Sequence, residues 1–284
     1  KSPKSILVVD DEKLIRWSLQ ERLQQAGYQV VVAVSAEQTL DSLSDGLALA
    51  LLVANGLAWS YALAPEAPGG LAAIREFARA GAVVSVGHTV ADTEQAEAAF
   101  AAGATHVTHM FNGMPPMHHR APGLVGAALT TAGVRVELIA DGVHLHPAAV
   151  RLALAAKGLE EVLLVTDSMA ATGCADGEYL LGPMQVIVRD GEARLPSGAL
   201  AGSTLTLERA VWNVARWTGD PVGEASGQSL GAAWQMASLN PARQLGLGDH
   251  VGRLVPGYDA DLMAVDAEGN VVLTMVGGEI VHRA

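Results

Sequence analysis

The sequence predicts an α/β fold made of consecutive βα units around a parallel sheet. From about residue 82 onward, short β-branched or apolar runs alternate with helical stretches. The runs expected to form strands are residues 82–86, 105–108, 134–139 and 162–166. Repetition of this unit is typical of a βα-barrel or of a doubly wound sheet. At 284 residues, the chain is long enough to bury a large core in either architecture.

The helical stretches carry their own start and stop signals. Asp92 and Gln95 have the spacing of a capping box, and Gly103 is placed to end the helix that they begin. Apolar residues at three- and four-residue spacing predict two further helices, at 147–157 before Gly158 and at 205–217 before Gly219.

The two ends of the chain differ from this middle part. Residues 6–9 and 30–34 predict strands, and a stripe of Ile15, Leu19 and Leu23 predicts a helix between them. Near the C-terminus, glycines separate three short apolar runs, which predicts a small antiparallel β element. We therefore expect a βα segment at 1–58, the main βα portion at 59–248 and a small β element at 249–284.

Composition narrows the class of function. The formal net charge of −12 gives a field that repels polyanions, so we expect neither nucleic acid nor a membrane surface as a partner. The longest apolar stretch, 47–59, is too short to span a bilayer, which needs roughly 20 residues. Cys174 is the only cysteine, which is consistent with a reducing compartment and a cytoplasmic location.

Polar side chains follow the predicted strands directly. They are Glu66, His88, His109, His144 and Asp167. Neighbours in this series are separated by 21 to 35 residues, about one βα unit each. Because the C-terminal ends of parallel strands form the site face of βα-barrels, we expect these side chains to converge.

This set of residue types points to metal-assisted hydrolysis. Two imidazoles and a carboxylate suit a catalytic divalent metal that activates water, and a further carboxylate, Asp167, is placed to transfer the proton. The remaining histidines have plainer interpretations. We expect a structural His106 inside its strand, loop residues at His118 and His119, and surface residues at His250 and His282.

Several longer strings make the pattern specific. They are LAPE ending at Glu66, SVGHT ending at Thr89, THMFNGM from Thr108, RAPGL from Arg120, ADGVH ending at His144, VTD ending at Asp167 and GSTLT from Gly202. In this order they resemble the N-acetylglucosamine-6-phosphate deacetylase family of amidohydrolases over about residues 60–284. Asn240 and Arg243 lie in another matching string, which we interpret as structural.

The resemblance implies a (βα)8-type barrel and a role for each matching residue. Glu66, His88 and His109 would bind the metal, with zinc expected and iron or another divalent ion as alternatives. Asp167 would be the catalytic acid and base. Asn112, the backbone of Gly113 and Arg120 would hold the substrate phosphate, for which the planar guanidinium is suited, and His144 would be a further substrate-binding residue. The substrate would be a small amino-sugar phosphate, and the assembly a homodimer.

The N-terminal segment departs from that family. Residues 6–12, 15–17 and 26–28 resemble the receiver domain of response regulators, in which paired acids such as Asp10 and Asp11 bind magnesium. The run 49–55 lacks the aspartate that receivers phosphorylate, so we do not expect phosphotransfer. We predict instead a composite barrel, in which flavodoxin-like receiver βα units supply the first strands.

Two alternatives to a working hydrolase remain open from the sequence. In the first, an impaired chimeric barrel folds and binds metal or sugar phosphate without turnover. In the second, the chain is a signalling module that uses Asp10 and Asp11.

Overall fold

The computed structural model describes residues 5–9, 29–33, 60–182, 184–219 and 227–284. The chain divides into two compact units, Lys1–Arg135 and Val136–Ala284. The domain boundaries expected after residues 58 and 248 were placed from sequence patterns, whereas this division is based on compactness. The expected boundaries therefore stay predictions.

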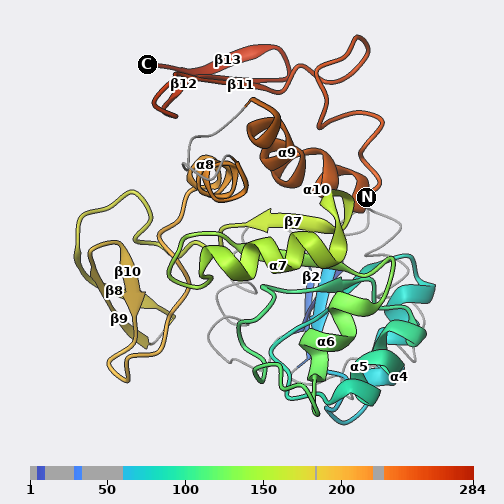
Figure 1. Cartoon of the computed structure of the whole chain (residues 1–284). Helices are drawn as coiled ribbons and strands as arrows, with labels where there is room; N and C mark the ends of the chain where they lie inside the picture. Colours follow the sequence, from blue (N-terminus) through green and yellow to red (C-terminus); the bar gives the residue numbers. More distant parts are fainter. Residues whose placement is uncertain (1–4, 10–28, 34–59, 183, 220–226) are drawn as a thin grey trace. The chain divides into compact units, whose positions relative to one another are not determined.

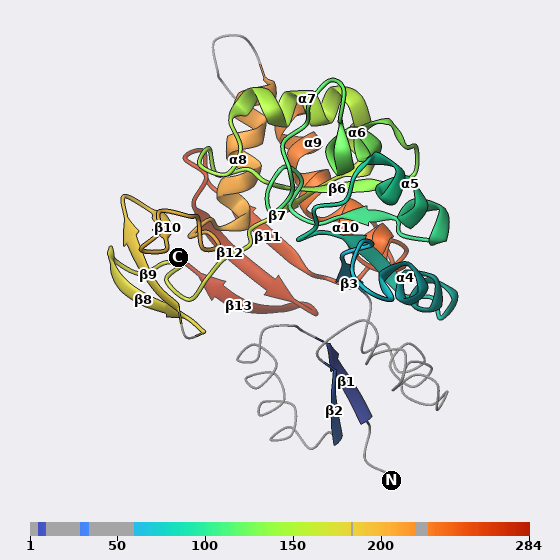
Figure 2. The same ribbon diagram turned by 90° about the horizontal axis from the view of Figure 1, so that it is seen from below.

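The first unit begins with a pair of parallel strands. Strand β1 (Ser5–Val9) pairs with β2 (Gln29–Ala33), with Ser5 opposite Gln29 and Val9 opposite Ala33 (Figure 2). The strands predicted at 6–9 and 30–34 are confirmed to within one residue. The helix predicted around Leu19 and the run 49–55 lie outside the described residues.

Three parallel strands and three helices follow in the same unit. The strands are β3 (Ser60–Leu63), β4 (Val83–Val86) and β5 (His106–Val107). The helices are α4 (Gly70–Arg79), α5 (Thr93–Ala102) and α6 (Gly123–Thr130), which lie side by side in this order (Figure 1). Strand β5 is shorter than the run predicted at 105–108, although the backbone N–H of Thr108 still donates to the carbonyl of Val86.

Helix α5 forms where its capping signals predict. The Asp92 side chain accepts from the backbone N–H of Gln95 at 2.8 Å, and the Gln95 side chain accepts from the backbone N–H of Asp92 at 3.0 Å. Gly103 ends the helix with a φ of 117°, a conformation that glycine adopts without steric cost. Local signals thus fix the helix between the two strands that precede His88 and His109.

The second unit contains further parallel strands. Strand β6 (Arg135–Ile139) pairs in parallel with β7 (Val162–Val165), and the whole sheet has five strands in the order β3-β4-β5-β6-β7. The helices of this unit are α7 (Pro147–Lys157), α8 (Leu207–Thr218), α9 (Gly227–Ala237) and α10 (Leu239–Gln244), with a 3-10 turn η1 (Leu159–Glu161) before β7. Helices α7 and α8 confirm the predicted ones, α7 with the same bounds. No helix in the described ranges is long and apolar enough to cross a membrane.

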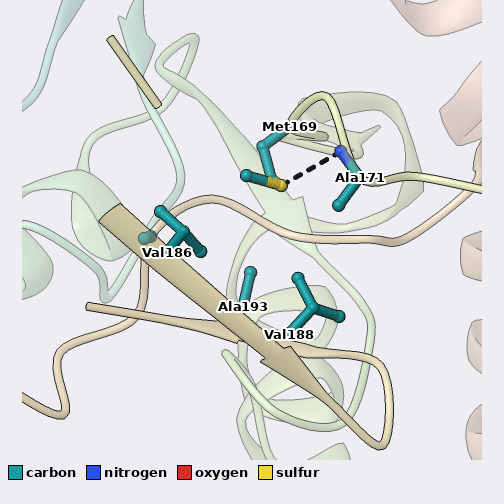
Figure 3. Packing of buried hydrophobic residues seen from close by; sticks show 6 residues of the cluster. Met169, Ala171, Val186, Val188 and Ala193 are labelled. Atoms are coloured by element: carbon teal, nitrogen blue, oxygen red, sulfur yellow. Dashed lines mark hydrogen bonds between the residues drawn. The ribbon is translucent and has the colours of Figure 1, made fainter. Parts of the chain in front are cut away.

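A three-stranded antiparallel sheet, which the sequence pattern does not predict, follows β7. It consists of β8 (Gly177–Leu181), β9 (Met184–Arg189) and β10 (Glu192–Arg194). Val186 and Val188 of β9 pack with Met169 and Ala171 (Figure 3). The backbone N–H of Ala171 donates to the sulfur of Met169. This small core holds the segment that comes directly after Asp167.

The C-terminal β element is confirmed. Strands β11 (Leu262–Val265), β12 (Val271–Val276) and β13 (Glu279–Arg283) form an antiparallel sheet in chain order. Gly277 and Gly278 form the turn between β12 and β13 with φ values of 56° and 85°. Positive φ at two successive residues suits the tight turn of a hairpin.

Candidate metal centre and substrate-binding residues

His88 and His109 face each other beyond the ends of two neighbouring strands. Val86 of β4 lies opposite Val107 of β5, and each histidine follows its strand by two residues. Their Nε2 atoms lie 2.8 Å apart, and the rings meet edge to face with centroids 4.6 Å apart. The structure therefore brings together two of the three residues predicted to bind a metal.

The tautomer of His109 is fixed by its other ring nitrogen. Nδ1 lies 3.0 Å from the carbonyl oxygen of Asn112, and a carbonyl only accepts, so Nδ1 carries the proton. In the neutral ring, Nε2 then presents a lone pair toward His88. An imidazole whose second nitrogen donates to a backbone carbonyl is the usual form of a metal-ligating histidine, so this pair fits a divalent ion.

Glu66 lies beside the same segment, but its carboxylate bonds to residues next to His88. One oxygen accepts from the Thr89 hydroxyl, and the other accepts from the backbone N–H of Val90 at 2.7 Å. In the part of the chain that the structure describes, no group of three or more histidine, cysteine, aspartate or glutamate residues is close enough to hold a metal. A metal role for Glu66 thus stays a prediction.

Several residues predicted for the site have strained backbones. Five non-glycine residues in the described ranges have a positive φ, namely His88 (49°), His109 (31°), Phe111 (76°), Asp167 (50°) and Asp190 (52°). Side chains larger than hydrogen adopt this region rarely, and such strain clusters at functional sites. Three of the five are the predicted metal ligands His88 and His109 and the predicted acid and base Asp167, which favours a functional reason for their geometry.

Gly113 packs against the histidine pair. Its φ is 61°, and a Cβ there would lie 3.1 Å from Cε1 of His109 and 3.5 Å from Nδ1 of His88. Its carbonyl accepts from the backbone N–H of Thr89 at 3.2 Å. The Asn112 side chain donates to the carbonyl of Met110 at 3.3 Å. The Asn112–Gly113 turn therefore supports the histidines, while its predicted contact with substrate stays a prediction.

Arg120 lies on an exposed turn. Its guanidinium Nη1 lies 2.6 Å from Nε2 of His119, and its backbone N–H donates to Nδ1 of His118 at 3.3 Å. His118 and His119 are exposed loop residues, as expected. The phosphate-binding role of Arg120 is untested by these contacts.

His106 is structural, as expected. It is only 2% exposed, and in the described structure its Nδ1 is buried without a hydrogen-bond partner. Burial, together with the positive charge of Arg135, lowers its pKa from 6.5 to about 4, although a backbone hydrogen bond at Thr105 opposes the shift. His106 is therefore neutral at pH 7 and supplies packing rather than charge.

In the second unit, His144 is held by Asp141, an aspartate that is not among the predicted site residues. Nδ1 of His144 lies 2.6 Å from Oδ2 of Asp141, and both side chains are mostly buried. Oδ1 of Asp141 accepts from the backbone N–H groups of Val143 and His144 at 2.8 and 2.7 Å. The signal available in the sequence was only an acid three residues before the histidine.

Asp167 is fixed through its backbone. Its carbonyl accepts from the backbone N–H of Ser203 at 2.7 Å, and the N–H of Met169 donates to the carbonyl of Ser203 at 2.9 Å. The hydroxyl of Ser203 donates to the carbonyl of Thr166 at 2.5 Å. Ser203 belongs to the GSTLT string, so this string holds the end of β7 in place.

The second unit also contains a polar cavity of about 860 Å³. Its lining includes Asp141, residues of α8 such as Arg209 and Asn213, and the turn at Glu268. The Asp141 loop thus forms part of a solvent-accessible wall.

A sequence model of the amidohydrolase family matches residues 33–281. The chain belongs to the amidohydrolase family. This amidohydrolase is 45% identical over 223 residues to N-acetylglucosamine-6-phosphate deacetylase from Vibrio furnissii. The matched region covers 78% of the chain and 54% of that relative. It is 43% identical over 219 residues to N-acetylgalactosamine-6-phosphate deacetylase from Escherichia coli, over 77% of the chain and 56% of that relative. The chain therefore spans about half the length of these relatives.

The fold of the amidohydrolase is also similar to solved structures. A mutant N-acetyl-D-glucosamine-6-phosphate deacetylase from Mycobacterium smegmatis, in complex with N-acetyl-D-glucosamine-6-phosphate, matches with a TM-score of 0.79 and 34% identity, over 98% of this chain and 75% of that one. The family membership expected from the strings is confirmed. The receiver-like interpretation of residues 1 to about 45 gains no support from these matches.

The site residues come from both units. Glu66, His88 and His109, with Asn112, Gly113 and Arg120, belong to the first, and His144 and Asp167 belong to the second. Their convergence around one ion and one substrate stays a prediction.

Proposed function

We propose that this amidohydrolase removes the acetyl group from N-acetylglucosamine 6-phosphate by metal-assisted hydrolysis. The observation that carries the proposal is the pair of facing imidazoles at the ends of β4 and β5, in a chain 45% identical to a deacetylase of that substrate. The fold match to a deacetylase solved with N-acetyl-D-glucosamine-6-phosphate supports the same substrate.

His88, His109 and Glu66 are the residues that would hold a divalent metal, which we expect to be zinc. When bound, the metal supplies a Lewis acid that polarises the acetyl carbonyl and acidifies water. The donation from Nδ1 of His109 to the Asn112 carbonyl keeps Nε2 available as a ligand. Gly113 leaves room for both rings, because it has no side chain to press on them.

Asp167 would act as the acid and base. Its carboxylate takes the proton of the attacking water and returns it to the amine nitrogen as the amide C–N bond breaks. The products are acetate and glucosamine 6-phosphate. The Ser203 contacts hold the backbone of Asp167, so the strained φ of 50° is maintained without help from substrate.

The remaining residues would bind the sugar phosphate. Arg120, whose planar guanidinium matches a phosphate, would hold the substrate phosphate together with Asn112 and the Gly113 backbone, and His144 would bind the rest of the substrate. For the scaffold, we propose a βα-barrel completed by strands from residues 1–58, supported by the parallel β1–β2 pair and the five-stranded parallel sheet. We also propose a homodimer and, from the single Cys174, a cytoplasmic location.

Acetate release from N-acetylglucosamine 6-phosphate by the full chain tests the proposal. We expect activity that a chelator removes and zinc restores, and a loss of about a thousandfold in kcat for Asp167→Asn, which keeps the shape but cannot take a proton. Elemental analysis of the same samples measures the bound metal. Metal retained by a parent chain without turnover would instead support the impaired-chimera alternative.

A second sugar phosphate checks the substrate. N-acetylgalactosamine 6-phosphate differs only in the configuration at C4, and a relative 43% identical to this chain carries its name. A higher kcat/KM for this sugar would correct the substrate assignment while leaving deacetylation intact.

A further inference from the structure

Asp141 makes three hydrogen bonds in the loop that follows β6. Oδ2 lies 2.6 Å from Nδ1 of His144, while Oδ1 accepts from two backbone N–H groups. The Asp141 side chain is 13% exposed and that of His144 is 6% exposed, so water competes little for these bonds. One carboxylate therefore closes the loop with one oxygen and holds the imidazole with the other.

The loop is also held from its other side. The Asn213 side chain of α8 donates to the carbonyl of Ala140 at 2.8 Å. Gly142 has a φ of 86° and lies against the Trp217 ring, which would be 3.7 Å from a Cβ at that position. The backbone is thus fixed without Oδ2, and this oxygen is left to act on the His144 ring alone.

The charge state of Asp141 decides which nitrogen of His144 carries the proton. Burial raises the pKa of Asp141, but the hydrogen bonds from the His144 side chain and from the backbone of His144 and Val143 outweigh it, so the pKa lies below its ordinary value. An ionised carboxylate only accepts, so Nδ1 of His144 must donate. In the neutral ring, Nε2 is then an acceptor.

We propose that Asp141 is a positioning residue that fixes the tautomer of His144, so that Nε2 of His144 accepts a hydrogen bond from a hydroxyl group of the substrate sugar. This inference rests on the proposed function and names the group that His144 recognises. A lone pair on Nε2 repels phosphate oxygens and the acetyl carbonyl, all of which are acceptors, whereas each sugar hydroxyl is a donor. The amide N–H is also a donor, but it belongs to the bond that is hydrolysed beside the metal. The phosphate is left to the donor groups proposed for it, Arg120 among them.

Asp141→Asn reverses this arrangement with little change in shape. The amide oxygen can still accept from the backbone N–H groups of Val143 and His144 in place of Oδ1. The amide NH₂ then replaces Oδ2 and donates to Nδ1, which moves the proton of His144 to Nε2. Glu268→Gln is the matched control, because Glu268 lines the same cavity and loses the same charge at a position outside the loop that carries His144.

Long-range ¹H–¹⁵N NMR of ¹⁵N-histidine-labelled protein reads the tautomer directly. His144→Gln identifies the His144 signals by their loss. We expect the Nδ1–H tautomer in the parent and in Glu268→Gln, and the Nε2–H tautomer in Asp141→Asn. A parent His144 that carries its proton on Nε2, or on both nitrogens at pH 7, overturns the inference even if the variant does not fold.

Kinetics with N-acetylglucosamine 6-phosphate test the substrate contact. In Asp141→Asn, the N–H at Nε2 of His144 would face the donating hydroxyl of the sugar, so that a buried polar group is left unpaired. We therefore expect the kcat/KM of Asp141→Asn to fall roughly tenfold to a hundredfold, mainly through KM. Glu268→Gln should stay within about twofold of the parent. An unchanged kcat/KM despite a reversed tautomer would refute the hydroxyl contact.

Failure of the two proposals can be told apart. A parent chain with the expected tautomer but no acetate release contradicts the proposed function and leaves the orientation of His144 standing. Acetate release from a parent chain with the wrong tautomer contradicts the role of Asp141 alone.

Discussion

Gly202 packs directly against the carbonyl of Asp167. A Cβ at position 202 would lie 2.9 Å from that oxygen, and the φ of Gly202 is 65°. The same carbonyl accepts the backbone N–H of Ser203, so the contact and the hydrogen bond come from adjacent residues. The geometry of the predicted acid and base is thus coupled to the identity of residue 202.

Gly202→Ala should therefore impair catalysis more than stability. The new methyl group pushes the Asp167 carbonyl away, and a displacement of about 1 Å at a reacting group can cost a hundredfold in kcat. The strained φ adds roughly 1–2 kcal/mol of lost stability. Acetate release and urea unfolding measure the two effects.

Gly198→Ala is the control for that change. Gly198 also has a positive φ, 89°, but a Cβ there meets nothing within 4 Å. It should lose comparable stability and keep its kcat. Equal kcat losses in both variants would mean that backbone strain, not the contact with Asp167, is responsible.

Gly113→Ala should weaken metal binding. The added methyl would lie 3.1 Å from Cε1 of His109, closer than most carbon contacts, so the ring has to shift from its place beside His88. We expect a loss of about tenfold or more in zinc affinity, measured by competition with a chromogenic chelator. Gly133→Ala, with a φ of 80° and open space around it, should bind zinc like the parent.

The sequence predicted the parts of the fold whose signals are local. The capping box of Asp92 and Gln95 and the terminator Gly103 define α5 on their own, and alternating apolar runs located β4, β6 and β7. The sheet β8–β10 was missed because few of its residues are buried. Its stability comes from packing of Val186 and Val188 on distant residues, which no local pattern reveals.

The same distinction holds for the candidate site. His88 and His109 were predicted because strand ends carry site residues in βα folds, and the structure brings their rings together. Asp141 and the Thr89 hydroxyl were not singled out, because a short polar side chain near a turn usually bonds only its own backbone. Their contacts to His144 and Glu66 depend on how the loops fold.

Asn240 has the structural role expected for the string that contains Asn240 and Arg243. The residue is 1% exposed, and its amide donates to the carbonyls of Leu159 and Val162 at 2.7 and 2.8 Å. Asn240→Ala leaves both carbonyls without this donor next to β7, so we expect a loss of roughly 2–4 kcal/mol in the free energy of unfolding. Asn270→Ala, at an exposed turn, should lose less than about 1 kcal/mol, and equal losses in urea unfolding would contradict the anchoring role.

The depressed pKa of His106 makes stability fall in mild acid. The pKa is about 4 in the folded chain and 6.5 in the unfolded one, so between these values the unfolded chain binds more protons. The contribution of the neutral ring is fully present above pH 6.5 and is lost as the pH falls toward 4, by roughly 3 kcal/mol in total. Urea unfolding of the parent and of His106→Gln at pH 7, 5.5 and 4.5 should show a steeper loss for the parent. His282→Gln changes an exposed histidine and should lose stability with falling pH as the parent does. Equal dependence of the free energy of unfolding on pH in all three proteins would show that His106 is not responsible for the loss in acid.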